Sequence, residues 1–303
     1  MSMLSHPLHK PLSLSLYQFG PLLVVIAALF WGITGGLGGW LIAKGWDPLT
    51  IALYRGGVGW LFVTAWLIWH PVNHGLKHPR LWLWSVVAGL GIAGNFAFYF
   101  ISIAQGSVAV AATLMYCAPV FVLLMSFALK LETPTLAKWS AMALVIIGIV
   151  LLTQVYQSDA SNVTLLGASA GLLAGLAYAG FIFGLKYAAP YGSPQAILMI
   201  AFSVLVILLA GMVDINEVWS AFHSQHWFWF ASIGVLGAGL SFILYVIGLH
   251  HTAPAVAAII AMVEPVTASL LGAWLLNQSL EPIQLVGMAL ILATVTALSR
   301  ATA

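Results

Sequence analysis

The sequence predicts an all-α membrane protein with ten transmembrane helices, arranged as two five-helix repeats of inverted topology. Three observations predict this fold class. Only 5% of the 303 residues are Lys, Arg, Asp or Glu, whereas 62% are hydrophobic and the mean hydropathy is +1.07. Soluble domains carry about 25% charged residues, so this chain cannot cover a water-facing surface. The other two observations are a series of apolar runs of membrane-spanning length and a similarity between the two halves of the chain.

The apolar runs are separated by prolines, glycines and the scarce charged residues. A helix that crosses a bilayer needs about 20 mostly apolar residues. Three runs begin with a polar or acidic residue followed by proline, at Asp47, Ser193 and Glu281, which is typical of a helix start. The connections are short, so consecutive helices are expected to be antiparallel. The predicted spans cover residues 20–43, 48–69, 81–104, 107–128, 135–153, 164–187, 192–211, 227–250, 253–276 and 282–299.

The cationic residues predict the orientation of these spans. Because the number of spans is even, both termini lie on one side of the membrane. If this side is the cytoplasm, only Lys44 among the cations lies outside and Arg55 lies within a span. The other cations fall in cytoplasmic segments: Lys10, Lys77, Arg80, Lys130, Lys138, Lys186 and Arg300. This bias follows the positive-inside rule, so we expect a multi-pass protein of the plasma membrane (the bacterial inner membrane) with both termini cytoplasmic.

The two halves of the chain are similar when the sequence is shifted by 146 residues. This shift places Tyr99 on Tyr245 and Pro119 on Pro265 without a gap, and a shift of 147 relates the first spans of the two halves. Because each repeat has an odd number of spans, the second repeat enters the membrane from the opposite side. The predicted organisation is a cytoplasmic tail at 1–19, a first repeat at 20–153 and a second repeat at 164–299.

Three segments carry a resemblance to a known family. They are Ala28-Leu29-Phe30-Trp31-Gly32 in the first span, Arg55 within ALYRGG in the second, and the segment at 262–295. These segments resemble the EamA-type members of the drug/metabolite transporter superfamily. The resemblance implies a ten-span transporter, whose relatives export amino acids and other small metabolites or import compounds such as choline. An acidic residue commonly follows the penultimate span of each unit in this family; Glu132 fits this pattern and Gln278 departs from it.

Arg55 and Glu264 are the ionisable residues that the prediction places inside spans. A charged side chain at the bilayer centre costs at least about 2.5–3.5 kcal/mol, so each is a candidate substrate-binding residue. Counted from the span ends, their depths differ by about 4 Å. Two interpretations are open: a permanent ion pair between the second and ninth spans, or a cavity where Glu264 binds an amino group or a proton and Arg55 binds a carboxylate. Pro265 removes a backbone donor and predicts a local break in the ninth span.

Aromatic and small polar residues are further candidates. Tyr99 and Tyr245, as repeat mates at opposite ends of their spans, predict either two gates or ordinary interfacial tyrosines. The other candidate substrate-binding residues are Trp31, Tyr116 and Tyr178 near mid-depth, and Asn95 and Ser241 one turn from the two tyrosines. All of them have a structural alternative, because aromatic side chains pack between helices and polar ones hydrogen-bond across them.

His250 and His251 end the eighth span on the predicted cytoplasmic side. Histidine changes charge near neutral pH, so this pair is a candidate for proton coupling together with Glu264; an interfacial role is the alternative. The sequence contains no nucleotide-binding loop, no H-E-x-x-H motif and a single cysteine, Cys117. We therefore expect no enzymatic activity, no catalytic residues, no cofactor and no bound metal.

Inverted repeats favour a transport function, because two similar halves of opposite orientation can exchange conformations and open a site alternately to either face. We expect a secondary active transporter of a small metabolite, by resemblance an amino-acid exporter, with proton-coupled antiport through Glu264. The alternatives are an importer of an organic cation such as choline, and a passive channel. The expected partners are the small-molecule substrate and the lipid bilayer but no nucleic acid, and the expected oligomeric state is a monomer or homodimer.

Overall fold

The computed structural model describes residues 13–69, 74–105, 107–158, 164–276 and 279–302. Throughout these ranges the regular secondary structure is helical and no strand is present. Nine stretches of the described chain are long and apolar enough to span a membrane, or ten if the bent pair Pro194–Ala210 and Ile215–His223 is one span. The predicted all-α membrane fold is confirmed. Lys10 and Gln278 lie outside the described residues.

The helices of the first half begin and end close to the predicted spans. The fourth predicted span is divided into two helices, and a short 3-10 helix follows the fifth. These elements are α1 (Ser13–Ala43), α2 (Pro48–Trp69), α3 (Pro79–Ala104), α4 (Val108–Met115), α5 (Ala118–Ala128), α6 (Leu136–Thr153) and η1 (Val155–Gln157).

The second half follows the same order with additional short elements. The eighth predicted span of the chain contains a π-helical turn, η4, and the ninth is divided into two helices. These elements are α7 (Leu165–Ala188), η3 (Ala189–Tyr191), α8 (Pro194–Ala210), α9 (Ile215–His223), α10 (Trp227–Gly234), η4 (Val235–Leu240), α11 (Ser241–His250), α12 (Pro254–Ile260), α13 (Val263–Leu276) and α14 (Pro282–Thr302).

The predicted proline-initiated helix starts are present. Asp47 Oδ2 accepts a hydrogen bond from the Thr50 backbone N–H at 2.9 Å, and Ser193 Oγ accepts one from the Ala196 N–H at 3.3 Å. The third such helix, α14, begins at Pro282. The capping oxygens stabilise α2 and α8 because the first N–H groups of a helix have no partner within the helix.

Two spans are interrupted at equivalent positions of the two repeats. The gap between α4 and α5, at 116–117, lies just before Pro119, and the gap between α12 and α13, at 261–262, lies just before Pro265. Proline lacks the N–H that would continue the helical hydrogen-bond ladder. The break that Pro265 predicts is confirmed, and its repeat mate accompanies the same break in the first half.

The connection after α8 contains a short helix in a segment for which the sequence predicts only a loop. This helix, α9, leaves α8 at an angle of 114°. Asp214 caps its first turn by accepting the Asn216 N–H at 2.9 Å. Its large apolar side chains Ile215, Trp219 and Phe222 are exposed, and their spacing places them on one face of the helix.

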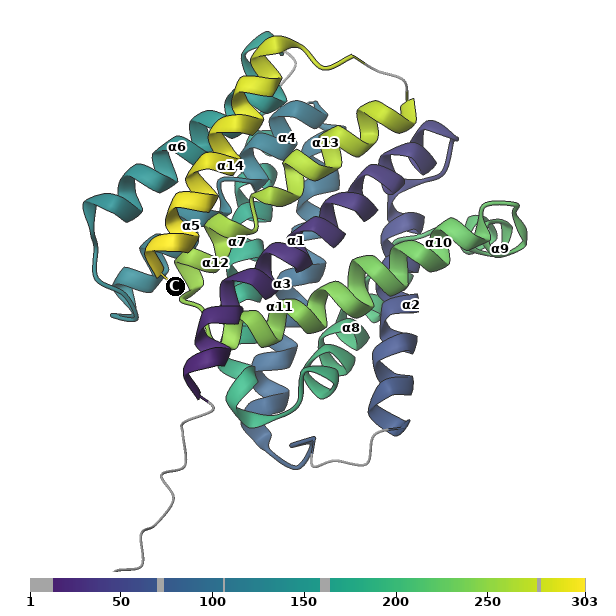
Figure 1. Cartoon of the computed structure of the whole chain (residues 1–303). Coiled ribbons are helices and arrows are strands. Elements are labelled where there is room, and N and C mark those ends of the chain that lie inside the picture. The colour runs from purple at the N-terminus through teal and green to yellow at the C-terminus, as the bar shows by residue number, and fades with distance from the viewer. Residues whose placement is uncertain (1–12, 70–73, 106, 159–163, 277–278, 303) are drawn as a thin grey trace, which may run out of the picture.

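The helices form two groups, and each group combines both halves of the chain (Figure 1). In the first, α7 packs along α3, α4 and α5; in the second, α1 packs along α11, α12 and α13. We call these the α3 group (α3, α4, α5 and α7) and the α1 group (α1, α11, α12 and α13). Beside them, α2 contacts α8 and α10, and α6 pairs with α14 at one edge.

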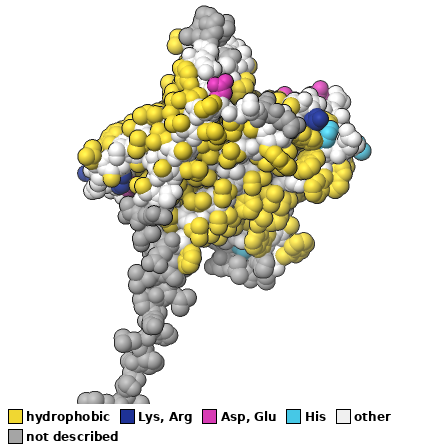
Figure 2. Space-filling view, turned by 45° about the horizontal axis from the view of Figure 1, so that its top comes forward, with side chains coloured by type: hydrophobic (Ala, Val, Ile, Leu, Met, Phe, Trp, Pro, Cys, Tyr) yellow, Lys and Arg dark blue, Asp and Glu magenta, His cyan; other side chains and the backbone are white. Residues whose placement is uncertain are grey.

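The surface is consistent with a lipid environment. Figure 2 shows a face covered by hydrophobic side chains, with charged and histidine side chains at its margins. Large apolar side chains such as Leu61, Ile68 and Leu90 are more than half exposed. This exposure is unfavourable in water but not in lipid, whose tails are as apolar as leucine.

Candidate functional site

A cavity of about 430 Å³ lies between the α3 group and the α1 group, with α2 forming one wall. Small-molecule sites have volumes of about 300–1,000 Å³. The cavity extends from the middle of the molecule to the end where α1 connects to α2, and there Ile42 and Val108 line it and are 46% and 60% exposed. We call this the mouth end, and we call the opposite end, where α11 connects to α12, the sealed end.

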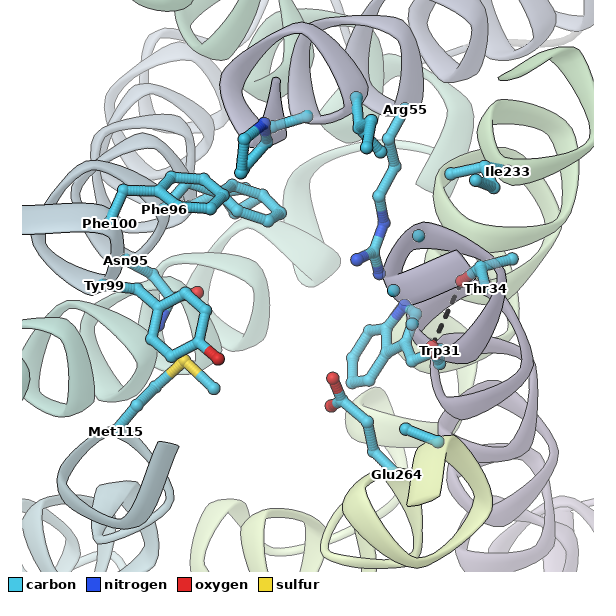
Figure 3. Close-up of a pocket in the computed structure, with 18 of the residues that line it drawn as sticks. Trp31, Thr34, Arg55, Asn95, Phe96, Tyr99, Phe100, Met115, Ile233 and Glu264 are labelled. Atoms are coloured by element: carbon cyan, nitrogen blue, oxygen red, sulfur yellow. Dashed lines mark hydrogen bonds between the residues drawn. The ribbon is translucent and has the colours of Figure 1, made fainter. Parts of the chain in front are cut away.

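Arg55 projects from α2 into the cavity, and one edge of its guanidinium is held by the protein. Its Nε–H donates a hydrogen bond to the carbonyl oxygen of Gly237 at 3.1 Å, and Cζ lies 5.7 Å from the centroid of the Phe96 ring. Gly237 belongs to η4, and single π-helical turns are frequent at functional sites. The contact with Gly237 occupies only Nε, so the terminal nitrogens face the cavity (Figure 3).

Glu264 projects from the first turn of α13 toward the same space. Gly32 allows the close approach of α1, because a Cβ at this position would lie 2.6 Å from the Glu264 carbonyl oxygen and 2.4 Å from Thr267 Cβ. Figure 3 shows the Arg55 guanidinium and the Glu264 carboxylate pointing into the cavity from opposite sides, with the Trp31 indole beside them. Both side chains are described, and no ion pair within 4.0 Å joins them. The fixed ion pair is therefore absent.

Aromatic side chains line the cavity around both charges. The predicted candidates Trp31, Tyr116 and Tyr178 all border it, as does Tyr99. Trp31 and Tyr178 are almost completely buried. The structure thus brings these four residues together with Arg55 and Glu264 in one site.

Further lining residues were not indicated by the sequence pattern. Phe96 and Phe242 border the cavity and directly follow Asn95 and Ser241. They are mates at the 146-residue shift, so a search for repeated aromatic residues beside the polar candidates would have found them. Gly237 could not be found in this way, because it contributes a backbone carbonyl, which every residue type has.

A layer of packed aromatic rings separates the cavity from the sealed end. The ring centroid of Trp31 lies 4.8 Å from that of Phe242 and 4.8 Å from that of Tyr245, and Phe181 lies 6.4 Å from Tyr245. We call these four residues the aromatic floor. Tyr245 is 0% exposed, whereas its repeat mate Tyr99 lines the cavity. The two mates therefore occupy opposite environments, Tyr99 at a cavity wall and Tyr245 buried within the aromatic floor.

Several polar atoms in or beside the aromatic floor are buried without a hydrogen-bond partner among the described residues. They are Trp31 Nε1, Tyr178 Oη, Ser241 Oγ and Tyr245 Oη. Buried polar groups are normally paired, and an unpaired one costs about 1–3 kcal/mol. These atoms therefore favour a ligand or a second conformation that satisfies them.

Of the remaining predicted residues, one lines the cavity, one is buried away from it and two lie at the sealed end. Asn95 lines the cavity, and its Nδ2 donates to the Ala174 carbonyl oxygen at 3.0 Å, which joins α3 to α7. Ser241 is fully buried and is not among the lining residues. His250 and His251 lie at the sealed end with ring centroids 4.8 Å apart. Neither histidine lines the cavity, so the structure does not bring them to Glu264.

Comparisons with known proteins identify the family of this architecture. The chain is 27% identical over 285 residues to the uncharacterized transporter YwfM of Bacillus subtilis, which covers 92% of this chain and 93% of the relative. It is 28% identical over 283 residues to an uncharacterized transporter of Archaeoglobus fulgidus, with coverage of 92% and 95%. A solved crystal structure with 18% sequence identity has the same fold, with a TM-score of 0.77 over 93% of this chain and 98% of that one. The model of the EamA-like transporter family matches residues 18–154 and again 165–300, and the protein therefore belongs to this family of membrane transporters.

Proposed function

We propose that the protein is a secondary active transporter that exports a small zwitterionic metabolite, an amino acid or a close relative, by alternating access. The supporting observation is the pair Arg55 and Glu264, which face one cavity from opposite sides without forming an ion pair. A buried charge without an oppositely charged partner is unfavourable, so a ligand that supplies the opposite charge would stabilise each side chain. A zwitterion brings a carboxylate for Arg55 and an ammonium group for Glu264 in one molecule.

The chemistry of the lining supports this class of substrate. A guanidinium presents paired N–H donors that match the two oxygens of a carboxylate. Aromatic rings such as Phe96, Tyr99 and Tyr116 supply a surface for the apolar part of the ligand. A cavity of about 430 Å³ has the size of known small-molecule sites.

The distribution of Lys and Arg supports an orientation with both termini in the cytoplasm. In this orientation the mouth end faces outward, and export requires a second conformation that opens the sealed end. Exchange of conformations between the inverted repeats would bury Tyr99 beneath a closed mouth and place Tyr245 at an open cavity wall. We therefore assign gating roles to these two mates.

Counterflow in proteoliposomes tests the proposal. Vesicles that contain the purified protein are loaded with an unlabelled amino acid at high concentration, and uptake of the same radiolabelled amino acid is followed. Protein-free vesicles are the control, and choline is the comparison substrate. We expect transient, saturable accumulation of the labelled amino acid. Saturable counterflow of choline but of no amino acid would favour an organic-cation transporter, and flux that stays linear with concentration would favour a channel.

A further inference from the structure

At the sealed end, Lys186 holds the C-terminus of α11. Lys186 projects from α7, and its Nζ donates to the carbonyl oxygens of Leu249, His250 and Thr252 at 2.6, 3.0 and 2.8 Å. The last carbonyl groups of a helix have no partner within the helix and carry partial negative charge, so a cation stabilises them. The contact fastens α7 of the α3 group to α11 of the α1 group.

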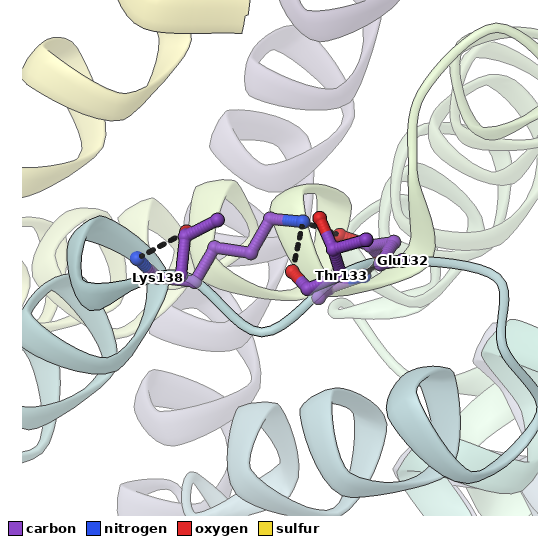
Figure 4. Close-up of polar contacts among 5 residues, drawn as sticks. Glu132, Thr133 and Lys138 are labelled. Atoms are coloured by element: carbon purple, nitrogen blue, oxygen red, sulfur yellow. Dashed lines mark hydrogen bonds and ion pairs between the residues drawn. The ribbon is translucent and has the colours of Figure 1, made fainter.

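Glu132, which follows α5, holds the start of α12. Figure 4 shows the Glu132 carboxylate beside the Lys138 ammonium group. Its Oε1 accepts a hydrogen bond from the Ala255 N–H at 3.0 Å, and its Oε2 lies 2.9 Å from Lys138 Nζ. The N-cap residue of α12 is Ala253, whose side chain cannot accept a hydrogen bond, so the Glu132 carboxylate supplies the cap. The Glu132 side chain is only 5% exposed, which shields the contact from water. It joins the end of α5 in the α3 group to α12 in the α1 group.

The two contacts hold the two sides of one connection. Lys186 binds carbonyl groups at the end of α11, and Glu132 binds an N–H at the start of α12. Each charge has the sign that the helix end requires, positive at a C-terminus and negative at an N-terminus. Lys186 belongs to α7 and Glu132 follows α5, both in the α3 group, and their partners lie on either side of the connection between α11 and α12 in the α1 group. Opening the sealed end separates the two groups there, so both contacts must break.

In the sequence, the repeat mates of Lys186 and Glu132 carry no charge. The shift of 147 places Gly39 at the position of Lys186, and the shift of 146 places Gln278 at the position of Glu132. The mate of α12 is α4, which is capped within its own repeat because Ser107 Oγ accepts the Val110 N–H at 3.2 Å. The sequence therefore provides no second copy of the Lys186 and Glu132 contacts in the other half of each repeat pair.

We infer that Lys186 and Glu132 form a charged latch that holds the sealed end closed and makes the mouth-open conformation the resting state. This inference rests on the alternating access proposed above, and it adds two positioning residues that lie outside the cavity. Loss of either contact shifts the equilibrium toward the conformation that is open at the sealed end.

Thiol accessibility of the full-length protein in detergent tests the latch without a substrate. Cys117 is replaced by alanine, and a single reporter cysteine is introduced at each end in separate proteins. Val108→Cys reports on the mouth end, where Val108 is 60% exposed, and Val256→Cys reports on α12, where Val256 is 2% exposed. The rate of reaction with a hydrophilic maleimide is then measured with and without Glu132→Gln, Lys186→Met and both substitutions.

The latch predicts opposite changes at the two reporters. Labelling of Val256→Cys rises at least about tenfold in each single latch variant, because Glu132→Gln removes the charge that strengthens the Ala255 contact and Lys186→Met removes three charge-assisted hydrogen bonds. Labelling of Val108→Cys falls in the double variant. The matched control is Lys130→Gln, which removes an exposed cation near the same end and leaves both rates at the parent values. Faster labelling at both reporters would indicate general loosening of the fold. That result, or parent rates in all latch variants, overturns the inference.

The labelling rates and the counterflow assay described above together separate the latch from the proposed substrate. If the reporters change in opposite directions but no amino acid shows counterflow, the latch stands and the substrate proposal fails. If counterflow is normal and the latch variants are labelled like the parent, the latch fails and the transport proposal stands.

Discussion

The two edges of the Arg55 guanidinium face different partners. Nε donates to the Gly237 carbonyl oxygen at 3.1 Å, and the terminal nitrogens face the cavity. A lysine at this position has one ammonium group and no Nε–H, so it cannot contact η4 and bind a carboxylate with two donors at the same time. The shape of the side chain therefore matters as much as its charge.

Arg55→Lys is accordingly expected to weaken binding of the amino acid although the positive charge is kept. Hydrogen bonds to a charged group contribute about 1.5–3 kcal/mol, which corresponds to roughly a 10- to 150-fold loss of affinity. The KM for counterflow measures this loss. A substrate analogue with an amine but no carboxylate is the control, and its KM should not change. An unchanged KM for the amino acid would show that its carboxylate does not bind Arg55.

Glu264→Gln keeps the shape of the side chain and removes its ability to gain or lose a proton. If Glu264 carries the coupled proton, the variant transports slowly and its rate is independent of pH, whereas the rate of the wild type varies with pH. Initial rates across a pH series, with the thermal unfolding midpoint as a control for folding, measure the difference. Wild-type pH dependence in the variant would place the coupling group elsewhere. The groups that interact electrostatically with Glu264 are Arg55, Tyr99, Tyr116, Tyr178 and Tyr245.

The sequence predicts the side chains of the site better than their partners. Arg55 and Glu264 are conspicuous because charges are rare inside spans, and the structure places both at one cavity. Gly237 and the carbonyl groups bound by Lys186 are backbone partners, so their residue types carry no signal. The sequence likewise marks Lys186 only as a cation that orients the protein, because its contact depends on a helix end more than 60 residues away.

At the scale of elements, small side chains determine how closely α1 approaches the helices of the site. A Cβ at Gly32 would lie 2.6 Å from the Glu264 carbonyl oxygen, and a Cβ at Gly237 would lie 2.4 Å from Thr34 Oγ1. α1 is therefore in close contact both with α13, which carries Glu264, and with η4, which holds Arg55. A bulkier residue at either contact must move an element of the site.

Gly32→Ala is expected to destabilise the protein by about 1–3 kcal/mol, because the added methyl group overpacks the contact between α1 and α13. The unfolding midpoint of the purified protein, followed by scanning fluorimetry, should fall. Gly272→Ala is the matched control, since Gly272 lies on α13 and an added Cβ there would meet nothing within 4 Å; here alanine is expected to be neutral or stabilising. Equal midpoints for the two variants would show that the contact relaxes to accept the methyl group.

At the scale of the whole molecule, the two helix groups cut across the two repeats. α7 of the second half packs with helices of the first, and α1 of the first half packs with helices of the second. Each end of the molecule therefore lies at a junction between the same two groups. The cavity reaches the mouth end, while the aromatic floor and the charged contacts of Lys186 and Glu132 lie toward the sealed end.

The orientation of the molecule in the membrane can be tested with one cysteine at each end in a Cys117→Ala background. We expect an impermeant maleimide added to intact cells to label Val108→Cys at the mouth end. It should label Lys130→Cys, near the sealed end, only after the membrane is permeabilised. The physical reason is the retention of positively charged segments on the cytoplasmic side. Labelling of Lys130→Cys in intact cells, with Val108→Cys protected, would reverse the orientation.

The fold itself is largely predictable from local chemistry. Span length, the proline-initiated helix starts and the break before Pro265 depend on short stretches of sequence, and the structure contains all of them. α9 is too short and too polar to show a spanning pattern, and only its cap at Asp214 and the spacing of its apolar residues indicate a helix. The combination of α7 with α3 and of α1 with α13 depends on contacts between distant segments, which periodicity does not encode.

The contrast between Tyr99 and Tyr245 has an energetic consequence for the exchange proposed above. One hydroxyphenyl ring borders the cavity while its mate is 0% exposed. If the two ends exchange, the apolar area that Tyr245 gives up to water is recovered when Tyr99 is covered. This pair then contributes nearly the same hydrophobic free energy to both conformations, because this term is proportional to the buried area. The exchange of these two side chains therefore favours neither conformation, which leaves the choice between them to other contacts and to a bound substrate.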